Sequence, residues 1–90
     1  MTRHEVHREA LNAVRNISYF QSSLKVTDEV MASKMGISRA TWANRKLKPF
    51  SLTLGEVIRA GEFFRSKGIS ISSAQLMTPL VGADVEGEAG

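Results

Sequence analysis

The sequence predicts an all-α fold, with a compact five-helix domain in residues 1–81 and an acidic tail in residues 82–90. Three observations support this prediction. Apolar residues recur at spacings of three and four over long segments. Serine or threonine precedes most of these segments as an N-cap. The one alternating stretch, residues 69–72, has no second strand to pair with.

The first helix is expected over residues 2–22. Thr2 and Glu5 have the spacing of a capping box, in which two side chains satisfy free backbone N–H groups at the start of a helix. One face of this helix carries the apolar residues Val6, Ala10, Val14, Ile17 and Phe20, with Gln21 beside the last of them.

The centre of the chain, residues 27–47, has the pattern of two short helices separated by a glycine. Thr27 is a good N-cap for the first, and two acidic residues follow it at the positive end of the helix dipole. Gly36 can adopt the left-handed conformation that ends a helix, and Ser38 can cap the second helix. Two helices joined by so short a turn cross steeply, so the second can project from the domain.

A loop is expected over residues 47–52, because Pro49 disfavours helix at the residue before it. Phe50 and Leu52 are large apolar residues in this loop, and we expect both to fill the core.

A fourth helix should begin after the loop, where Thr53 and Glu56 form a second capping box, and end at Gly68. Its inward face is predicted to carry Leu54, Val57, Ile58, Ala60, Gly61 and Phe64.

The C-terminal part is predicted to contain an extended connector, residues 69–72, and a short helix through residues 74–77. Ser72 or Ser73 can cap that helix. Residues 82–90 lack periodicity and are rich in acidic residues and glycine, so we expect them to be disordered.

The composition indicates a soluble cytoplasmic protein. The chain has no cysteine, which excludes disulfides and thiolate metal sites. It shows no signal peptide and no apolar run long enough to cross a membrane, so we expect no membrane partner.

Charge is unevenly distributed along the chain. Residues 1–81 hold 12 basic and 6 acidic side chains, a balance of +6. Residues 39–48 include four basic side chains and no acidic one. Such a local positive field favours a polyanionic partner, with a solvated helix face as the alternative.

The residues do not indicate an enzyme. His4 and His7 are three positions apart on one helix face, which suits two metal ligands, but no third ligand is near them in the sequence. We interpret them as surface histidines and expect no metal or cofactor. No nucleophile and base pattern and no phosphate-binding glycine loop is present.

The central segment resembles the helix-turn-helix of the phage repressor and Cro family, also called the Xre family. The resemblance depends on Ala32, Gly36-Ile37-Ser38-Arg39, Thr41 and Trp42, and it extends over about residues 4–78. It implies a lambda-repressor-like domain that binds double-stranded operator DNA and regulates transcription.

By this resemblance, the second helix of the motif lies in the major groove. The residues implied to contact bases are Arg39, Ala40, Ala43 and Asn44. Arg39 can pair with guanine, Asn44 with adenine, and Ala40 can contact a thymine methyl group. The residues implied to contact the DNA backbone are Ser38, Thr41, Arg45, Lys46, Lys48 and Ser51.

Two positions depart from the family pattern. Family members often have glutamine at Asp28 and use it to hold a phosphate, which an aspartate would repel. Arg45 stands where the family usually has a buried aliphatic residue. Either its stem packs while the guanidinium reaches solvent or phosphate, or Trp42 and Leu47 fill the core and Arg45 belongs to the DNA face. We favour the second, with Trp42 buried rather than stacked on a base.

The leading hypothesis is a sequence-specific transcriptional repressor of Cro type, encoded by a phage or prophage. The alternatives are the antitoxin of a toxin–antitoxin pair, and a helix-turn-helix domain used only for protein binding. We expect a weak homodimer, or dimerisation on DNA, through residues 69–81, whose apolar side chains have intramolecular packing as the alternative role.

Overall fold

A computed structural model describes residues 3–80 of the chain, with side chains from residue 8 onward. This part is all-helical, with five α-helices, one 3-10 turn and no strand, as predicted. The elements are α1 (Arg3–Ser23), α2 (Asp28–Met35), α3 (Arg39–Leu47), the 3-10 turn η1 (Pro49–Ser51), α4 (Leu54–Ser66) and α5 (Ser73–Leu76). None of these helices is both long and apolar enough to span a bilayer. The predicted disordered tail lies outside the described residues.

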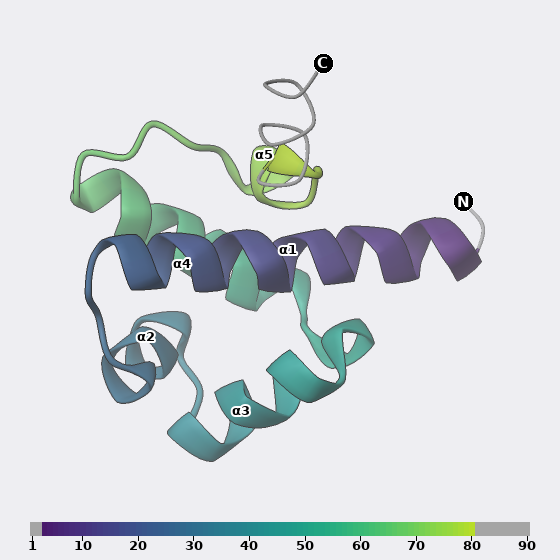
Figure 1. The fold of residues 1–90 in the computed structure, drawn as a ribbon, viewed down its shortest axis with the longest axis horizontal. Helices are drawn as coiled ribbons and strands as arrows, with labels where there is room; N and C mark the ends of the chain where they lie inside the picture. The colour runs from purple at the N-terminus through teal and green to yellow at the C-terminus, as the bar shows by residue number, and fades with distance from the viewer. Residues whose placement is uncertain (1–2, 81–90) are drawn as a thin grey trace.

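Helix α1 runs through the middle of the molecule (Figure 1). Helices α2 and α3 lie on one side of it, and α5 lies on the opposite side, while α4 packs alongside α1. The aromatic rings of Phe20 and Phe64 meet between α1 and α4, with centroids 5.4 Å apart. The motif α2–turn–α3 is therefore presented at one side of the domain.

The predicted helix ends are confirmed where the structure describes them. The hydroxyl of Thr27 accepts a hydrogen bond from the Val30 N–H, and Gly36 is left-handed with a φ of 79°. The capping box of Thr53 and Glu56 is formed. The predicted box of Thr2 and Glu5 lies outside the described side chains.

The choice left open for the last helix is resolved in favour of Ser72. Its hydroxyl accepts from the Gln75 N–H, and the Gln75 side chain completes a further capping box. The loop after α3 contains the turn η1, which the sequence pattern did not indicate.

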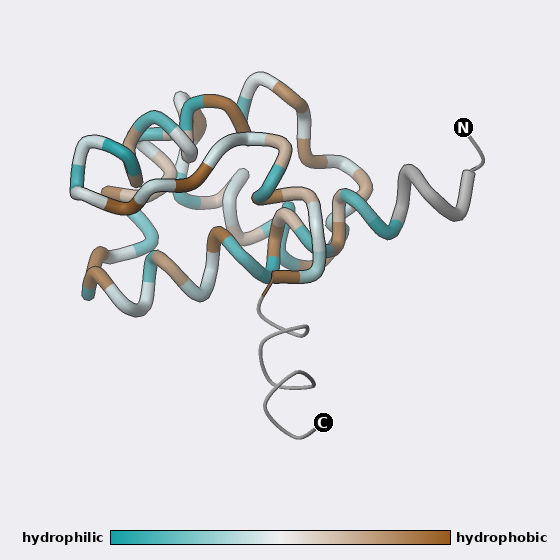
Figure 2. Tube along the Cα trace, turned by 90° about the horizontal axis from the view of Figure 1, so that it is seen from above, coloured by the Kyte–Doolittle hydropathy of each residue, from teal (hydrophilic) through white to brown (hydrophobic). Residues whose placement is uncertain are grey.

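The core lies between α1, α2, α3 and α4 and is completed by α5 and the connector before it. Hydrophobic and hydrophilic stretches alternate along the Cα trace (Figure 2). Its buried apolar residues are Ala13, Ile17, Met31, Ala32, Met35, Trp42, Val57, Ala60, Phe63, Phe64, Ile71 and Leu76. Trp42 is fully buried, as predicted.

Three residues predicted to face inward do not. Phe50 is 61% exposed and Leu54 is 59% exposed, and Ile58 is exposed as well. The inward face of α4 is centred on residues 57, 60 and 64, so Leu54 and Ile58 lie at its edge. Leu52 packs against the core in the place that was also expected for Phe50.

Two asparagines of α1 hold the C-terminal segment. The Asn16 amide donates to the carbonyls of Leu76 and Thr78 at 2.8 and 2.6 Å, and that of Asn12 donates to the Met77 carbonyl at 3.2 Å. These bonds satisfy carbonyl groups at the end of α5 that a helix leaves free.

The apolar side chains of residues 69–80 pack within the same chain, which was the alternative to a dimer surface. Ile71 and Leu76 are buried, and Ile69, Met77 and Leu80 pack against the core. Residue 81 lies outside the described part of the chain. The homodimer itself remains a prediction, but this segment retains little apolar surface for it.

Candidate nucleic-acid interface

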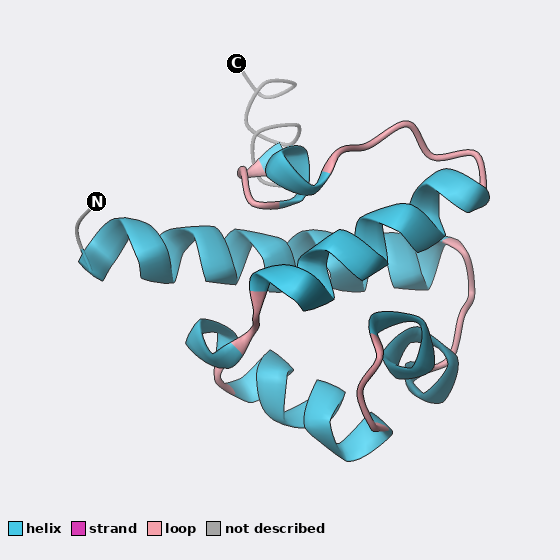
Figure 3. Ribbon diagram, turned by 180° about the vertical axis from the view of Figure 1, so that it is seen from behind, coloured by secondary structure: helices cyan, strands magenta, loops and turns pink. Residues whose placement is uncertain are grey.

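The four residues of α3 that were predicted to contact bases share one solvent-facing side of the helix. Helix α3 itself lies at the outer edge of the domain (Figure 3). Arg39, Ala40, Ala43 and Asn44 are all exposed. At 3.6 residues per turn, these four positions and Leu47 fall within one face. Trp42 lies on the opposite face and is the one buried residue of α3. Helix α3 is thus fixed to the domain through Trp42, and its opposite face remains accessible to solvent.

A hydrogen-bonded chain fixes the inner face of α3 to α1 and α2. The indole N–H of Trp42 donates to the side-chain oxygen of Gln21 at 3.0 Å. The amide nitrogen of Gln21 donates to the carboxylate of Asp28 at 2.8 Å and to the Val26 carbonyl at 3.1 Å. Gln21 is buried, so both ends of its amide are used. The sequence indicated this role of Gln21 only through its position beside the apolar face of α1.

Asp28 continues the chain by binding Lys46. The ammonium nitrogen of Lys46 lies 2.9 Å from an Asp28 carboxylate oxygen and 5.5 Å from the centre of the Trp42 ring. The hydrogen bond from Gln21, followed by that from Lys46, lowers the pKa of Asp28 below its usual 3.8. Lys46 was predicted to contact DNA phosphates, and in the structure its charge is already paired.

Arg45 belongs to the body of the domain. Its Nε and Nη2 atoms donate to the two carboxylate oxygens of Glu56 at 3.0 and 3.1 Å, which joins α3 to α4. The interpretation that we favoured placed Leu47 in the core beside Trp42, and this part is wrong, because Leu47 is 81% exposed. Arg45 is paired with Glu56, and its contact with the DNA backbone stays a prediction. The Arg45 side chain can be largely covered at this position because α4 supplies the carboxylate that pairs with it.

Glu56 is the partner that makes this possible, and it is only 5% exposed. Burial raises the pKa of Glu56, but the hydrogen bonds from Arg45 and Thr53 outweigh burial and lower it below its usual 4.5. The capping box indicated Glu56 as a helix cap, and no sequence signal linked it to Arg45.

The predicted hydroxyl contacts are engaged in local bonds. The Ser38 hydroxyl accepts from the Thr41 N–H at 3.1 Å and donates to the Thr41 hydroxyl at 2.9 Å. The Ser51 hydroxyl donates to the Lys48 carbonyl at 2.6 Å. Each hydroxyl remains near the surface, so a phosphate contact would supplement or replace these bonds.

The positive charge of residues 39–48 is partly neutralised in the structure by acidic residues that lie outside this segment. Of its four basic side chains, Arg45 and Lys46 are paired with acids from other elements, whereas Arg39 and Lys48 are exposed and outside any ion pair of the described residues. Arg39 also borders a surface hollow of about 560 Å³ that Asp28 and Glu29 help to line.

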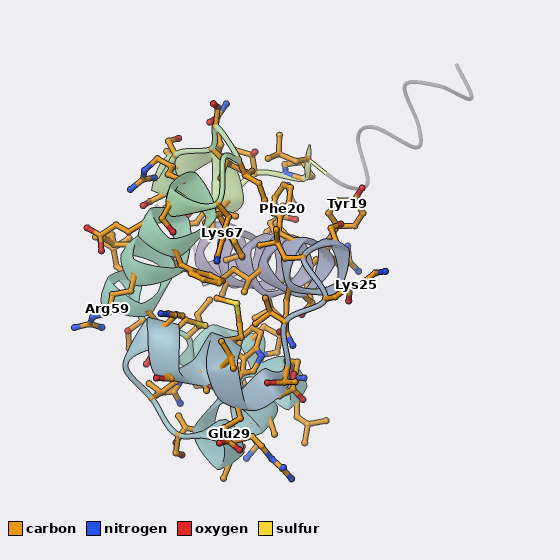
Figure 4. The ribbon with its side chains drawn as sticks, turned by 90° about the vertical axis from the view of Figure 1, so that its left-hand side faces the viewer. Tyr19, Phe20, Lys25, Glu29, Arg59 and Lys67 are labelled. Carbon is orange, nitrogen blue, oxygen red and sulfur yellow. The ribbon has the colours of Figure 1, made fainter. Side chains whose placement is uncertain are left out.

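Figure 4 shows Glu29 pointing outward on the α2–α3 side, and Arg59 pointing outward from α4. Arg59 donates to the Met35 carbonyl at the end of α2, at 3.3 Å. Within the described side chains, no group of acidic residues and histidines forms a metal site. His4 and His7 lie outside those side chains.

No protein-family model, curated protein or solved structure matches the chain.

Proposed function

We propose that the protein binds double-stranded DNA through the exposed face of α3 and acts as a transcriptional regulator of the phage repressor and Cro type. One observation carries the proposal. Arg39 and Asn44, two side chains suited to reading bases, flank two alanines on the free side of a helix whose other side is held by polar ties.

The composition of this face suits close approach to base edges. Ala40 and Ala43 are small, so the helix axis can lie deep in a major groove. Arg39 can then donate two hydrogen bonds to a guanine, and Asn44 can pair with an adenine. Ser38, Thr41, Lys48 and Ser51 are near enough to the surface to contact the backbone of the same duplex.

Base contacts should contribute an unusually large share of the binding free energy. Each phosphate neutralised by a basic side chain adds about 0.9 to the slope of log affinity against log salt. Residues 39–48 contain four basic side chains, but Arg45 and Lys46 are paired with Glu56 and Asp28. Two basic side chains therefore remain to neutralise phosphates. We therefore expect a shallow salt dependence for binding per protein copy.

Selection of binding sites from random duplexes with the full chain tests the proposal. We expect an enriched sequence whose binding weakens with salt and is lost in an Arg39→Ala/Asn44→Ala variant. The control Ala74→Ser, at an exposed position of α5, should leave binding unchanged. Failure to enrich any duplex, with no salt-dependent binding, would overturn the proposal. It would favour α3 as a protein-binding surface, for which exposed Leu47 is the supporting observation.

A further inference from the structure

A hollow lies beside α1, and we call it the α1 groove. Its volume is about 630 Å³, and pockets that bind ligands typically measure about 300–1,000 Å³. Its apolar walls include Leu11 and Val14 of α1 and Pro79, which follows α5. Lys46 of α3 also lines it. The α1 groove therefore reaches from α3 across α1 to the segment after α5, which lie on opposite sides of α1 in Figure 1.

The charged side chains that line the α1 groove are basic, and none of its described lining residues is acidic. Arg15 is exposed and takes part in no ion pair of the described side chains. Lys46 binds Asp28, but its side chain is still 33% exposed, and an ammonium group has three hydrogen-bond donors. The groove thus combines apolar walls with positive charge, which suits an acidic segment that contains an apolar residue.

The chain carries such a segment shortly after the groove. Residues 84–88 have the sequence Asp-Val-Glu-Gly-Glu, with three acidic side chains around Val85, and we call them the acidic segment. They follow Leu80, which comes directly after Pro79 in the groove wall. An extended residue spans at most about 3.3–3.6 Å, so Asp84 can lie up to about 13–14 Å and Glu88 up to about 26–29 Å from Leu80. The acidic segment is therefore long enough to reach the groove.

Hydrogen bonds hold the chain beside the groove just before the acidic segment begins. Asn12 and Asn16 line the groove and donate to the carbonyl groups of residues 76–78. A contact made by the residues that follow is intramolecular, and a short linker gives it an effective concentration in the millimolar range. Even a weak contact between the acidic segment and the groove would then be populated.

We propose that the acidic segment binds the α1 groove of the same molecule. Val85 packs against the apolar walls, and the acidic side chains pair with Arg15 and Lys46. A DNA phosphate could meet the same two cations, but a duplex would leave the apolar walls unused. The acidic segment matches both the charge and the apolar character of the groove.

The consequence for DNA rests on the proposed function. Because Lys46 belongs to α3, the bound segment sets three negative charges beside the helix that is proposed to read DNA. Those charges repel the phosphates of an approaching duplex. The bound segment therefore lowers the affinity of the domain for DNA.

Disulfide formation tests the contact without DNA. The chain has no cysteine, so Ser18→Cys/Val85→Cys places one thiol on the groove wall and one in the acidic segment. The matched control, Ala74→Cys/Val85→Cys, has its first thiol at an exposed position of α5 that is much closer to residue 85 in the sequence. Loop closure alone therefore favours the control.

In a glutathione buffer, we expect the groove pair of the full chain to form its intramolecular disulfide to an extent about tenfold or more above the control. Neutralising the acidic segment by Asp84→Asn/Glu86→Gln/Glu88→Gln should reduce this to the level of the control. Closure no greater than in the control, closure unchanged by neutralisation, or disulfides only between two chains would overturn the proposal.

DNA separates this inference from the proposed function. The probe is a duplex selected with the full chain. The neutralised acidic segment should tighten binding about threefold or more. The gain should be smaller in a Leu11→Ser background, which removes an apolar wall of the groove and no charge. An equal gain in both backgrounds would be an effect of total charge and would overturn the proposed consequence for DNA. Absence of binding to any duplex would overturn the function, and the disulfide result would still decide the contact.

Discussion

The side-chain oxygen of Gln21 accepts a hydrogen bond from the indole nitrogen of Trp42, with 3.0 Å between the two atoms, so α1 holds the buried Trp42 side chain of α3. The same amide donates to Asp28. Gln21, a residue of α1, therefore helps to position both α2 and α3. Substitutions of Gln21 should affect the packing of all three helices.

Gln21→Glu should destabilise the fold in a pH-dependent way. The new carboxylate can still accept from Trp42 but faces the carboxylate of Asp28 in a buried position. We expect a loss of about 2–3 kcal/mol in the free energy of unfolding at pH 7, shrinking toward pH 4 as one carboxylate is protonated. Urea unfolding followed by Trp42 fluorescence measures this. Gln21→Met, which keeps the volume without the charge, should cost about 1–2 kcal/mol at both pH values. Equal losses in the two variants at pH 7 would contradict the proposed repulsion.

Arg45→Met should reduce stability by about 2–3 kcal/mol, because it leaves the buried carboxylate of Glu56 without its ionic partner. Adding Glu56→Gln should recover part of that loss, so a double-mutant cycle should show coupling of about 1 kcal/mol or more. A stability unchanged by Arg45→Met would mean that the guanidinium is free for DNA after all.

Stability should fall in acid below about pH 4.5. The pKa of Glu56 is lowered in the folded state, so its contribution is complete above the unfolded value of 4.5 and disappears as pH falls through the folded value. The pKa of Asp28 is lowered too and adds to the loss below 3.8. Denaturation between pH 7 and pH 2 measures the slope. Glu56→Gln should flatten the part nearest pH 4, and an unaltered profile in that variant would contradict the assignment.

Gly36→Ala should cost about 1–2 kcal/mol, because the left-handed φ of 79° disfavours any residue with a Cβ atom. The atoms nearest to the added methyl group would be those of the Arg59 side chain, at an ordinary 3.5 Å, so the cost is conformational. Gly55→Ala is the matched control, since Gly55 is helical and has room, and it should stabilise the protein by about 0.5–1 kcal/mol. Thermal unfolding of both variants measures the contrast, and a Gly36→Ala protein as stable as the natural chain would contradict it.

The ion pairs predict different effects for neighbouring basic residues on DNA binding. Arg39→Ala should cost about 1–3 kcal/mol and relax the preference at one base pair. Lys48→Ala should weaken binding to all sequences and lower the salt slope by about one. Lys46→Ala should lower the slope by much less, because Asp28 already pairs with Lys46. Equilibrium titrations at several salt concentrations compare the three, and equal slopes for the two lysine variants would show that Lys46 leaves Asp28 on DNA.

Local features of the fold were predictable from the sequence because they depend on residues a few positions apart. The caps at Thr27, Ser38 and Thr53 and the left-handed Gly36 are of this kind. The burial of Trp42 also followed from helical spacing.

Features that depend on how helices pack were not predictable in the same way. Glu56 reaches Arg45 because the fold brings the first turn of α4 close to α3, and Lys46 of α3 reaches Asp28 at the start of α2. Phe50 was expected in the core because large apolar residues usually are, but Leu52 takes that place and leaves Phe50 outside. The outward residues of α3 were correctly predicted to be accessible, whereas the charge available near them was overestimated.

Asn12 and Asn16 grip main-chain oxygens at the end of α5, and every residue type provides such an oxygen. These hydrogen bonds therefore require the asparagine side chains but not any particular side chain at exposed position 78. We expect a natural or engineered library to accept many residues at position 78 and few at position 16.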